Sequence, residues 1–495
     1  MDRVHSYYRP LPSSPYHYND FKNYITKGLN DDVIDCYGKI SQFVPTTEDH
    51  FKVTISLVTL NMYKADFHFF SRFIRIEPSP IFESGSDGSF ENYRPYIYEF
   101  IAEIDSEQKN HLSIYQERWI NVQIHNYSAS KSGKDVINGT ELFSASPLIA
   151  NYKTLVFNAG STTDPTCKLL DNLYTKNNLY KITNNTVNHY SSLSSIEAFL
   201  SNKIKSVQGM VYSVGLGNNS KIILEDAIGN AYTFLYDLGR SHLSEVLLRQ
   251  EVDTNIKSFK KSRFDAVILS HWDIDHILAI GDYNPQSLYS KNRLWIAPDI
   301  NILPVAKITA SALRLACYIS QNCNTFLFND PGTNIKFHVP YDNFQIWQGK
   351  AHPSGTATHQ NNIGLMVNIF GTGEYYVEQG IKHTSVTKTF LNNISNSNID
   401  LLMCGDCVYD NWPDTLKDKE HNILWVPHHG TNRAIPQNGE LNDTDNGIAI
   451  ISADDSDQTT HFPGMDHIYA LVEKGYSHIF VTKQSGSVYF NIIYN

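Results

Sequence analysis

Four side chains of types that commonly bind metal ions lie close together in the sequence: His271, Asp273, Asp275 and His276. They follow a short apolar run, 266–269, whose composition predicts a strand that is buried on both faces. Burying imidazoles and carboxylates without partners would cost on the order of several kcal/mol each. A divalent cation removes this cost, because neutral imidazole and carboxylate are ligands for zinc, manganese or iron. A polar loop that happens to contain two histidines is the alternative interpretation.

Later segments repeat this pattern of an apolar strand followed by a ligand-type residue. In chain order, Asp237 follows the strand predicted at 232–236, Asp406 ends the strand predicted at 399–406, His428 and His429 follow 422–427, and His461 comes after 447–452. A carboxylate after a single strand is usually a turn residue. The joint recurrence predicts instead that these strand ends meet at one edge of a layered α/β domain.

Length and composition limit the kind of protein. With 495 residues the chain has room for about two to four domains, and its 41% hydrophobic and 18% charged residues are compatible with a sizeable core. The formal net charge of −11 disfavours non-specific duplex binding, which depends on Lys and Arg. The segment 257–263, with three lysines and one arginine, is the best candidate for a local basic patch, and a solvated connection is the simpler interpretation.

Cysteines and apolar runs bear on the compartment. Six cysteines in a chain of this length do not suggest a disulfide framework. Cys404 and Cys407 have the spacing of a redox pair, but no βαβ redox context surrounds them, and we interpret both as small apolar residues beside Asp406. The start of the chain has no signal-peptide pattern, and its apolar runs are shorter than the ~20 residues of a membrane helix. We therefore expect a soluble, cytoplasmic protein with no membrane partner.

The pattern along the chain predicts two domains. Residues 1–205 carry no catalytic pattern and are expected to form a separate α+β domain, with a short helix at 31–43. A recognition or assembly module that binds a protein partner and a purely structural extension both fit this part. Residues 206–495 carry the ligand-type residues, with a further helix predicted at 306–321 and a further strand at 361–367.

The motif His271-x-Asp273-x-Asp275-His276 resembles the metal-binding motif of the metallo-β-lactamase fold, with Asp where the second histidine usually stands. The segments Asp237-Leu238-Gly239, Gly405-Asp406, His428-His429-Gly430-Thr431 and His461-Phe462-Pro463 occur in the order of that family. The combination is most similar to the hydrolase domain of ComEC-type DNA-uptake proteins and their soluble relatives, over about residues 209–495. At 213–218 the chain departs from the Asp-Val-Gly-Gln-Gly-Asp pattern of those relatives. The channel-forming membrane segments of ComEC itself are absent from the sequence, so DNA uptake is not implied.

The resemblance implies a four-layer αββα sandwich in which two divalent cations, zinc or manganese, generate a hydroxide for hydrolysis. The implied ligands of one cation are His271, Asp273 and one histidine of the 428–429 pair, for which His428 is favoured. Those of the second are Asp275, His276 and His461, and Asp406 would bridge the two. Asp275 and His429 are the expected catalytic residues, with His429 as the proton donor to the leaving group. Asp237 would orient the His271 loop from behind.

The expected activity is therefore that of a metal-dependent phosphodiesterase or nuclease acting on a phosphodiester or nucleotide-like substrate, nucleic acid included. Two alternatives stay open: a hydrolase of another ester, of phosphorylcholine or lactone type, and a catalytically silent, metal-stabilised binding module in a larger assembly such as one of antiviral defence. Asp273 stands in the place of a histidine and gives the first cation site a harder, oxygen ligand, which favours manganese over zinc.

Overall fold

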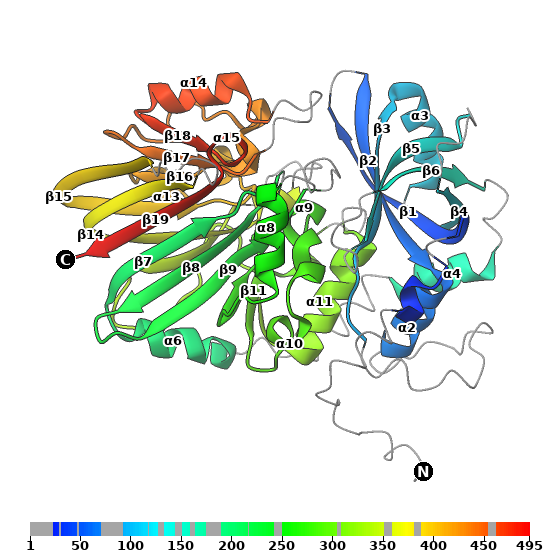
Figure 1. Cartoon of the computed structure of the whole chain (residues 1–495), viewed down its shortest axis with the longest axis horizontal. Helices are drawn as coiled ribbons and strands as arrows, with labels where there is room; N and C mark the ends of the chain where they lie inside the picture. Colours follow the sequence, from blue (N-terminus) through cyan, green and yellow to red (C-terminus); the bar gives the residue numbers. More distant parts are fainter. Residues whose placement is uncertain are drawn as a thin grey trace, which may run out of the picture. The chain divides into compact units, whose positions relative to one another are not determined.

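The computed structural model consists of two compact units (Figure 1). It describes residues 23–28, 31–46, 49–70, 93–116, 118–126, 133–143, 151–158, 164–174, 190–215, 217–241, 250–303, 308–350, 359–380, 388–453 and 462–495. The first unit, here the barrel unit, comprises Met1–Ala145, Asn151–Asn185 and Leu313–Tyr318. The second, here the sheet unit, comprises Ser146–Ala150, Thr186–Ala312 and Ile319–Asn495.

The barrel unit is built on a closed antiparallel barrel with the strand order β1-β2-β3-β5-β6-β4. Its strands are β1 (Val33–Pro45), β2 (His50–Thr59), β3 (Tyr98–Asp105), β4 (Ile120–His125), β5 (Val136–Phe143) and β6 (Asn151–Phe157). The barrel unit also contains the helices α2 (Leu60–Phe70), α3 (Ser106–Leu112) and α4 (Pro165–Leu173) and the 3₁₀ turn η3 (Ser113–Tyr115).

The helix predicted at 31–43 is wrong, because this segment forms strand β1. Ile34, Cys36 and Ile40 are buried while the residues between them are more exposed, except for Gly38, which shares the buried face. This period of two is that of a strand with one face toward a core. The segment pairs with β2 along one side and with β4 along the other, so partners distant in sequence determine its conformation.

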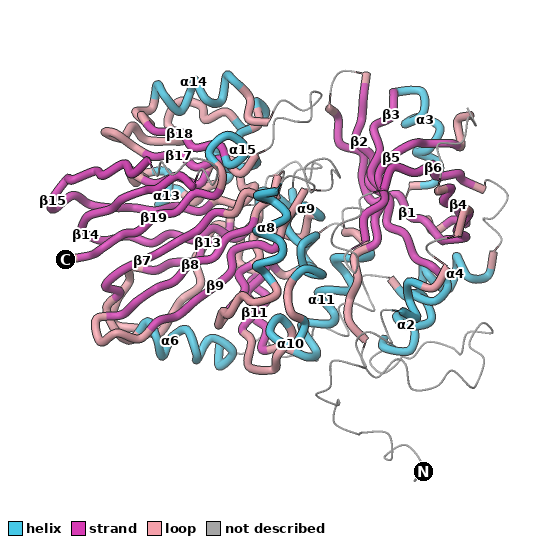
Figure 2. The backbone as a smooth tube through the Cα atoms, in the orientation of Figure 1, coloured by secondary structure: helices cyan, strands magenta, loops and turns pink. Residues whose placement is uncertain are grey.

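The sheet unit contains one 13-stranded mixed sheet, whose strand order is β12-β11-β10-β9-β8-β7-β19-β14-β15-β16-β17-β18, with β13 paired to β14 (Figure 2). The strands are β7 (Ile204–Val211), β8 (Asn219–Asp226), β9 (Ala231–Leu238), β10 (Ala266–Ile268), β11 (Leu294–Pro298), β12 (Asn324–Phe328), β13 (Phe344–Gln348), β14 (Leu365–Gly380), β15 (Lys388–Met403), β16 (Ile423–Trp425), β17 (Ile448–Ile451), β18 (His478–Val481) and β19 (Ser487–Tyr494). Strands β9 to β12 form one parallel block and β15 to β18 another.

Short helices and 3₁₀ turns connect these strands. They are η5 (Tyr190–Leu193), α6 (Ser194–Leu200), α8 (Gln250–Phe259), α9 (Ile274–Ile277), η6 (Leu278–Asp282), α10 (Pro285–Leu288), η7 (Ile300–Ile302), α11 (Ala310–Asn322), α12 (His359–Asn362), η9 (Tyr409–Asn411), α13 (Asp414–Lys417), η10 (Pro427–Gly430), η11 (Asn432–Ala434), α14 (Met465–Glu473) and α15 (Thr482–Ser485). The predicted helix at 306–321 corresponds to α11. The strand predicted at 361–367 begins only at Leu365, because residues 361 and 362 end the short helix α12.

The two parallel blocks face each other across one apolar core. The Tyr236 ring on β9 contacts the Trp425 ring on β16, with 5.8 Å between the ring centroids. Because several strands separate β9 from β16 within the sheet, this contact crosses from face to face. The Tyr236 hydroxyl also donates to the backbone oxygens of Leu365 and Met403, at 2.8 and 3.2 Å. The carboxyl ends of the two blocks therefore lie close together.

A second apolar cluster covers the other face of the block around β15 to β17. It contains Leu402, Leu424 and Ala449 from the strands, together with Leu416 of α13 and Leu471 of α14. Helices thus pack on the face of this block that points away from the shared core. Among the helices that the structure describes, none is both long and apolar enough to cross a membrane.

Candidate metal centre

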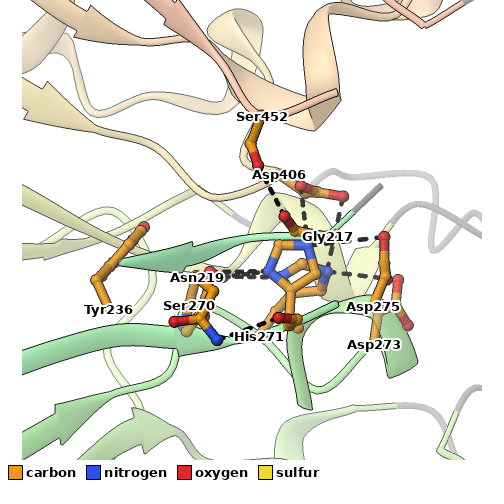
Figure 3. A network of polar contacts seen from close by, with 12 residues as sticks. Gly217, Asn219, Tyr236, Ser270, His271, Asp273, Asp275, Asp406 and Ser452 are labelled. Atoms are coloured by element: carbon orange, nitrogen blue, oxygen red, sulfur yellow. Dashed lines mark hydrogen bonds and ion pairs between the residues drawn. The ribbon is translucent and has the colours of Figure 1, made fainter. Parts of the chain in front are cut away.

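Polar side chains from several strand ends converge at one edge of the sheet unit (Figure 3). In chain order, Asp237 lies directly before Leu238, the last residue of β9, His271 and Asp273 follow β10, Asp275 and His276 lie on α9, Asp406 follows β15, and His428 and His429 lie in η10 after β16. Parallel strands of one block end at the same edge, which is where α/β sheets bind ligands. The facing blocks bring two such edges together.

Asp406 lies at the centre of these side chains and is only 3% exposed. Its Oδ1 atom lies 3.2 Å from His276 Nε2 and 3.8 Å from His429 Nε2. Its Oδ2 atom lies 3.8 Å from His271 Nε2 and 3.9 Å from His428 Nε2. The two oxygens of one carboxylate therefore face two different pairs of imidazoles.

Each pair of imidazoles has a further carboxylate. On the Oδ1 side, Asp275 Oδ2 lies 3.1 Å from His429 Nε2 and 4.0 Å from His276 Nε2. One ligand atom from each of Asp275, His276, Asp406 and His429 can be chosen so that all lie within 4.8 Å of one another. We call Asp275, His276 and His429 the Oδ1 group.

On the opposite side of Asp406, the Asp273 Oδ2 atom lies 3.4 Å from His271 Nε2. His428 completes this side and is the more open of the two neighbouring histidines, with 28% of its side chain exposed. We call His271, Asp273 and His428 the Oδ2 group.

Three of the rings are held so that Nε2 faces the centre. His276 Nδ1–H donates to Asp237 Oδ2 at 2.8 Å, and His429 Nδ1–H donates to the Ser452 carbonyl at 2.6 Å. His271 Nδ1–H donates to Ser270 Oγ at 3.0 Å, and that hydroxyl donates to Asp237 at 2.8 Å. An imidazole whose Nδ1 is the donor presents a lone pair at Nε2, which is the arrangement of metal-binding histidines.

The donor set fits a divalent cation. Within the described part of the chain, His271 Nε2, His276 Nε2 and Asp406 Oδ1 are buried atoms without a hydrogen-bond partner. Buried polar atoms of this kind are costly unless something pairs with them. Imidazole nitrogens and carboxylate oxygens are the ligands that zinc and manganese accept. A cation at this edge would satisfy the unpaired atoms.

The charges of the site support the same conclusion. Burial acts most strongly on His276 and lowers its pKa, but Asp406, Asp237 and Asp275 together raise that pKa well above its usual value. Burial also raises the pKa of Asp406, but the neighbouring histidines bring it well below its usual range. The carboxylates therefore concentrate negative charge around these imidazoles, and such a site favours a bound cation.

The pKa values of the two neighbouring histidines, His428 and His429, shift in opposite directions. Burial is again the largest influence and lowers the pKa of both rings. For His429, the carboxylates of Asp406 and Asp275 outweigh burial and raise the pKa above its usual value. For His428 they do not, and its pKa is lowered. The neighbouring carboxylates therefore affect the pKa of His429 more strongly than that of His428.

Unusual backbone conformations gather at this site. Of the non-glycine residues that the structure describes, Asp237, His428, His429 and Asn446 have positive φ angles, of 60°, 48°, 54° and 57°. Such conformations cost on the order of 1–3 kcal/mol each and persist only when the surroundings fix them. Three of these four residues belong to the site.

Glycines allow two close approaches beside the ligands. Gly405 has a φ of 55°, and a Cβ atom there would lie 2.5 Å from the Cβ of Ser270. A Cβ atom at Gly239 would lie 1.8 Å from the backbone oxygen of Asp275. These positions therefore need glycine for the loops to come together.

The structure brings most of the predicted site residues together. These are Asp237, His271, Asp273, Asp275, His276, Asp406, His428 and His429. His461 lies outside the described residues. Sequence reasoning missed Ser270, which adjoins the motif, and Ser452, which acts through its backbone carbonyl and so leaves no side-chain signal.

Comparisons with known proteins add a structural similarity. No protein-family model and no curated protein matches the chain. Among solved structures, a long form RNase Z from yeast is similar over 57% of this chain and 41% of that chain, with 12% sequence identity and a TM-score of 0.32. The chain thus spans less than half of that structure.

Proposed function

We propose that the chain is a metal-dependent hydrolase of the metallo-β-lactamase fold that cleaves phosphodiesters, with nucleic acid as the favoured substrate class. The observation that carries the proposal is the position of Asp406, whose two oxygens face separate groups of ligand-type residues. A carboxylate placed in this way is suited to bridge two cations. Paired cations are a recurrent device for phosphodiester hydrolysis.

Two further observations support the fold. The parallel blocks face each other through Tyr236 and Trp425, and helices α13 and α14 cover the outer face of one block. This arrangement is compatible with a four-layer αββα sandwich. The ligand-type residues also follow one another along the chain in the order of the metallo-β-lactamase motifs.

The proposed ligands follow from the two sides of Asp406. One cation would be held by the Oδ2 group, His271, Asp273 and His428, and the other by the Oδ1 group, Asp275, His276 and His429. His429 is therefore proposed as a ligand rather than as a proton donor, because its Nε2 atom lies 3.1 Å from Asp275 Oδ2. His461 stays a candidate for a further ligand.

The cations and the protein have separate tasks in this proposal. When bound, a pair of cations lowers the pKa of water and neutralises the charge of a phosphodiester. Asp237, Ser270 and the Ser452 carbonyl hold the rings so that their Nε2 atoms face inward before any ligand arrives. Such preorganisation avoids the cost of reorienting these groups during the reaction.

The test compares cleavage by the wild-type chain and by two variants. Metal-stripped protein is loaded with manganese or zinc and incubated with bis-p-nitrophenyl phosphate, single- and double-stranded DNA, RNA, a phosphorylcholine ester and a lactone. We expect cleavage of a phosphodiester, its loss in Asp275→Ala, and its retention in Asp443→Ala, whose side chain is 80% exposed at a surface ion pair.

Other outcomes of this experiment contradict the proposal. Cation binding without turnover of any ester would indicate a silent binding module, and turnover of the lactone or phosphorylcholine ester alone would indicate the other ester class. The carboxylate Asp273 leads us to expect a higher rate with manganese than with zinc. Full activity with zinc alone removes that part of the proposal.

A further inference from the structure

Buried His467 uses both ring nitrogens in hydrogen bonds. It lies on α14 and is fully buried, with 0% of its surface exposed. Its Nδ1–H donates to the carbonyl of Thr431 at 2.9 Å, and its Nε2 accepts from the hydroxyl of Tyr409 at 3.0 Å. Its backbone N–H donates to Asn432 Oδ1 at 3.3 Å. The imidazole is therefore neutral and fixed in one tautomer.

These partners lie on the two loops that carry the Asp406 carboxylate and the neighbouring histidines. Tyr409 begins η9, three residues after Asp406. Thr431 follows η10 directly, and its N–H donates to the backbone oxygen of His428 at 3.1 Å. His467 thus joins both loops from a helix that carries none of the proposed ligands.

The turn that His467 contacts is strained. His428 and His429 both have left-handed backbone conformations, at an expected cost of about 1–3 kcal/mol each. The turn persists because its ends are tied down: His428 N–H donates to the Gly405 carbonyl at 3.1 Å, and Gly464 N–H donates to the Gly430 carbonyl at 2.9 Å. The bond from His467 to Thr431 is a further tie at the same end.

We propose that His467, supported by Tyr409, is a positioning residue of the metal centre that fixes the two imidazoles of η10 relative to Asp406. The inference rests on the proposed function only in so far as the centre binds divalent cations. Its action runs through the Thr431 carbonyl and the Tyr409 hydroxyl, not through contact with the cations. Groups that orient metal ligands from behind typically change metal affinity about 10–100-fold when they are replaced.

Two substitutions separate hydrogen bonding from packing at this position. His467→Phe fills much of the volume but leaves the Thr431 carbonyl and the Tyr409 hydroxyl without their partner. His467→Gln offers an amide NH₂ group as donor and a carbonyl oxygen as acceptor, and so keeps both functions of the neutral imidazole. If positioning by hydrogen bonds is the role, glutamine rescues what phenylalanine loses.

The chain offers a matched control in His421. This residue is 1% exposed, and its Nδ1 and Nε2 atoms pair with Asp400 Oδ1 at 2.5 Å and the Leu416 carbonyl at 2.9 Å. It precedes β16, whereas His428 and His429 follow that strand. His421→Phe therefore removes a comparable buried imidazole at the other end of the strand.

The experiment measures cobalt(II) as a spectroscopic probe in the full-length chain. Each variant is titrated with cobalt(II), and its absorption spectrum, cobalt affinity and thermal unfolding are recorded. We expect His467→Phe to bind cobalt about 10–100-fold more weakly and with an altered spectrum. His467→Gln should keep most of the affinity, and His421→Phe should lower the Tm with a wild-type spectrum and affinity.

A wild-type spectrum and affinity in His467→Phe would overturn the inference. If that variant fails to fold, Tyr409→Phe decides, because it removes one hydroxyl only: a weaker and altered cobalt site supports the inference, and an unchanged one overturns it. Wild-type protein that binds cobalt but cleaves no phosphodiester contradicts the proposed hydrolase, while the cobalt measurements still judge the role of His467. Wild-type protein that binds no divalent cation overturns both.

Discussion

At the scale of single residues, Asp237 orients imidazoles from both groups around Asp406. Its Oδ2 atom accepts directly from His276 Nδ1–H at 2.8 Å. Through the Ser270 hydroxyl it also orients His271, and its Oδ1 atom accepts from the Ser270 N–H at 2.6 Å. One buried carboxylate behind the ligands thus fixes a ring on each side of the centre. The Asp-Leu-Gly pattern indicated this residue in the sequence, but not its double role.

The substitution Asp237→Asn tests this role. An asparagine side chain keeps the size of Asp237 but can no longer accept from both Ser270 and His276 as a carboxylate does. We expect cation affinity to fall by about 10–100-fold, with a matching loss of cleavage when the cation concentration is limiting. Competition with a chelator measures the affinity. Asp226→Asn is the control, because Asp226 is buried and accepts from Ile228 and Asn230 in a turn of the sheet unit. Equal affinities in the two variants would contradict the assignment.

The buried carboxylate of Asp282 should make the stability of the folded chain depend on pH. Asp282 Oδ2 lies 2.9 Å from Arg240 Nε, and the two side chains are 1% and 3% exposed. Burial raises the pKa of Asp282 to about 7, although Arg240 opposes this shift. Since the unfolded value is about 3.9, the stability that this group contributes is full below that pH and is lost as the pH rises through about 7.

The measurement is the free energy of unfolding in urea from pH 5 to pH 8, for the wild type and for Asp282→Asn. We expect the wild type to lose stability with rising pH more steeply than the variant, which has no group to titrate at this position. Parallel pH profiles for the two proteins would count against a raised pKa at Asp282.

At the scale of elements, the strands of the site could be predicted more readily than its loops. The predicted strands 266–269, 399–406 and 447–452 are mostly apolar, with polar residues at or directly after their ends, and each overlaps a strand of the structure. The direction in which each imidazole points could not be predicted from the sequence. It depends on two consecutive left-handed residues, His428 and His429, which are fixed by backbone groups far away in the sequence.

Two predicted elements also differ from the structure because contacts distant in sequence determine them. The segment 31–43 forms β1 because β2 and β4 pair with it, and no local propensity reports such distant partners. The predicted strand at 361–367 starts at Leu365, where the N–H donates to the Ser270 carbonyl at 2.8 Å. That contact places the chain directly behind the metal motif and fixes where the strand begins.

The loop before Asp406 gives a prediction at this scale. In Gly405→Ala the new methyl group has both an unfavourable φ and a contact of 2.5 Å with Ser270. The control Gly439→Ala has a φ of 82° but no atom within 4 Å of the new Cβ. We expect Gly439→Ala to cost about 1–2 kcal/mol of stability and Gly405→Ala clearly more, with weakened cation binding only in the latter. Urea unfolding and chelator competition measure the two effects, and equal behaviour of the variants would contradict this account.

At the scale of the whole molecule, the chain forms two units that the sequence does not separate cleanly. Residues 313–318 of α11 belong to the barrel unit, although the rest of that helix belongs to the sheet unit. Within the barrel unit, Arg314 Nε lies 2.6 Å from Asp66 Oδ2, and the Tyr93 hydroxyl donates to Asp66 Oδ1 at 2.7 Å. Closure of the barrel and this pairing are long-range events, which a local reading of the sequence could not predict. The role of the barrel unit in recognition or assembly stays a prediction.

The buried ion pair between Asp66 and Arg314 should contribute to the stability of the whole chain. Removing one partner of a buried ion pair leaves an unpaired charge and typically costs about 3–5 kcal/mol. We therefore expect Asp66→Leu and Arg314→Met each to destabilise the full chain by about that amount. The double variant should be more stable than the sum of the single changes implies, because it leaves no unpaired charge. Additive losses in thermal or urea unfolding would show that the two side chains are not coupled.

The most direct test of the central claim is the number of divalent cations bound per chain, measured by metal analysis of the wild type and of Asp406→Ala, His428→Ala and His429→Ala. A bridging Asp406 predicts two cations in the wild type, tight binding of neither in Asp406→Ala, and loss of a different single cation in each histidine variant. A wild-type chain with one cation, or histidine variants that both lose the same one, would contradict the claim that the oxygens of Asp406 serve two separate sites.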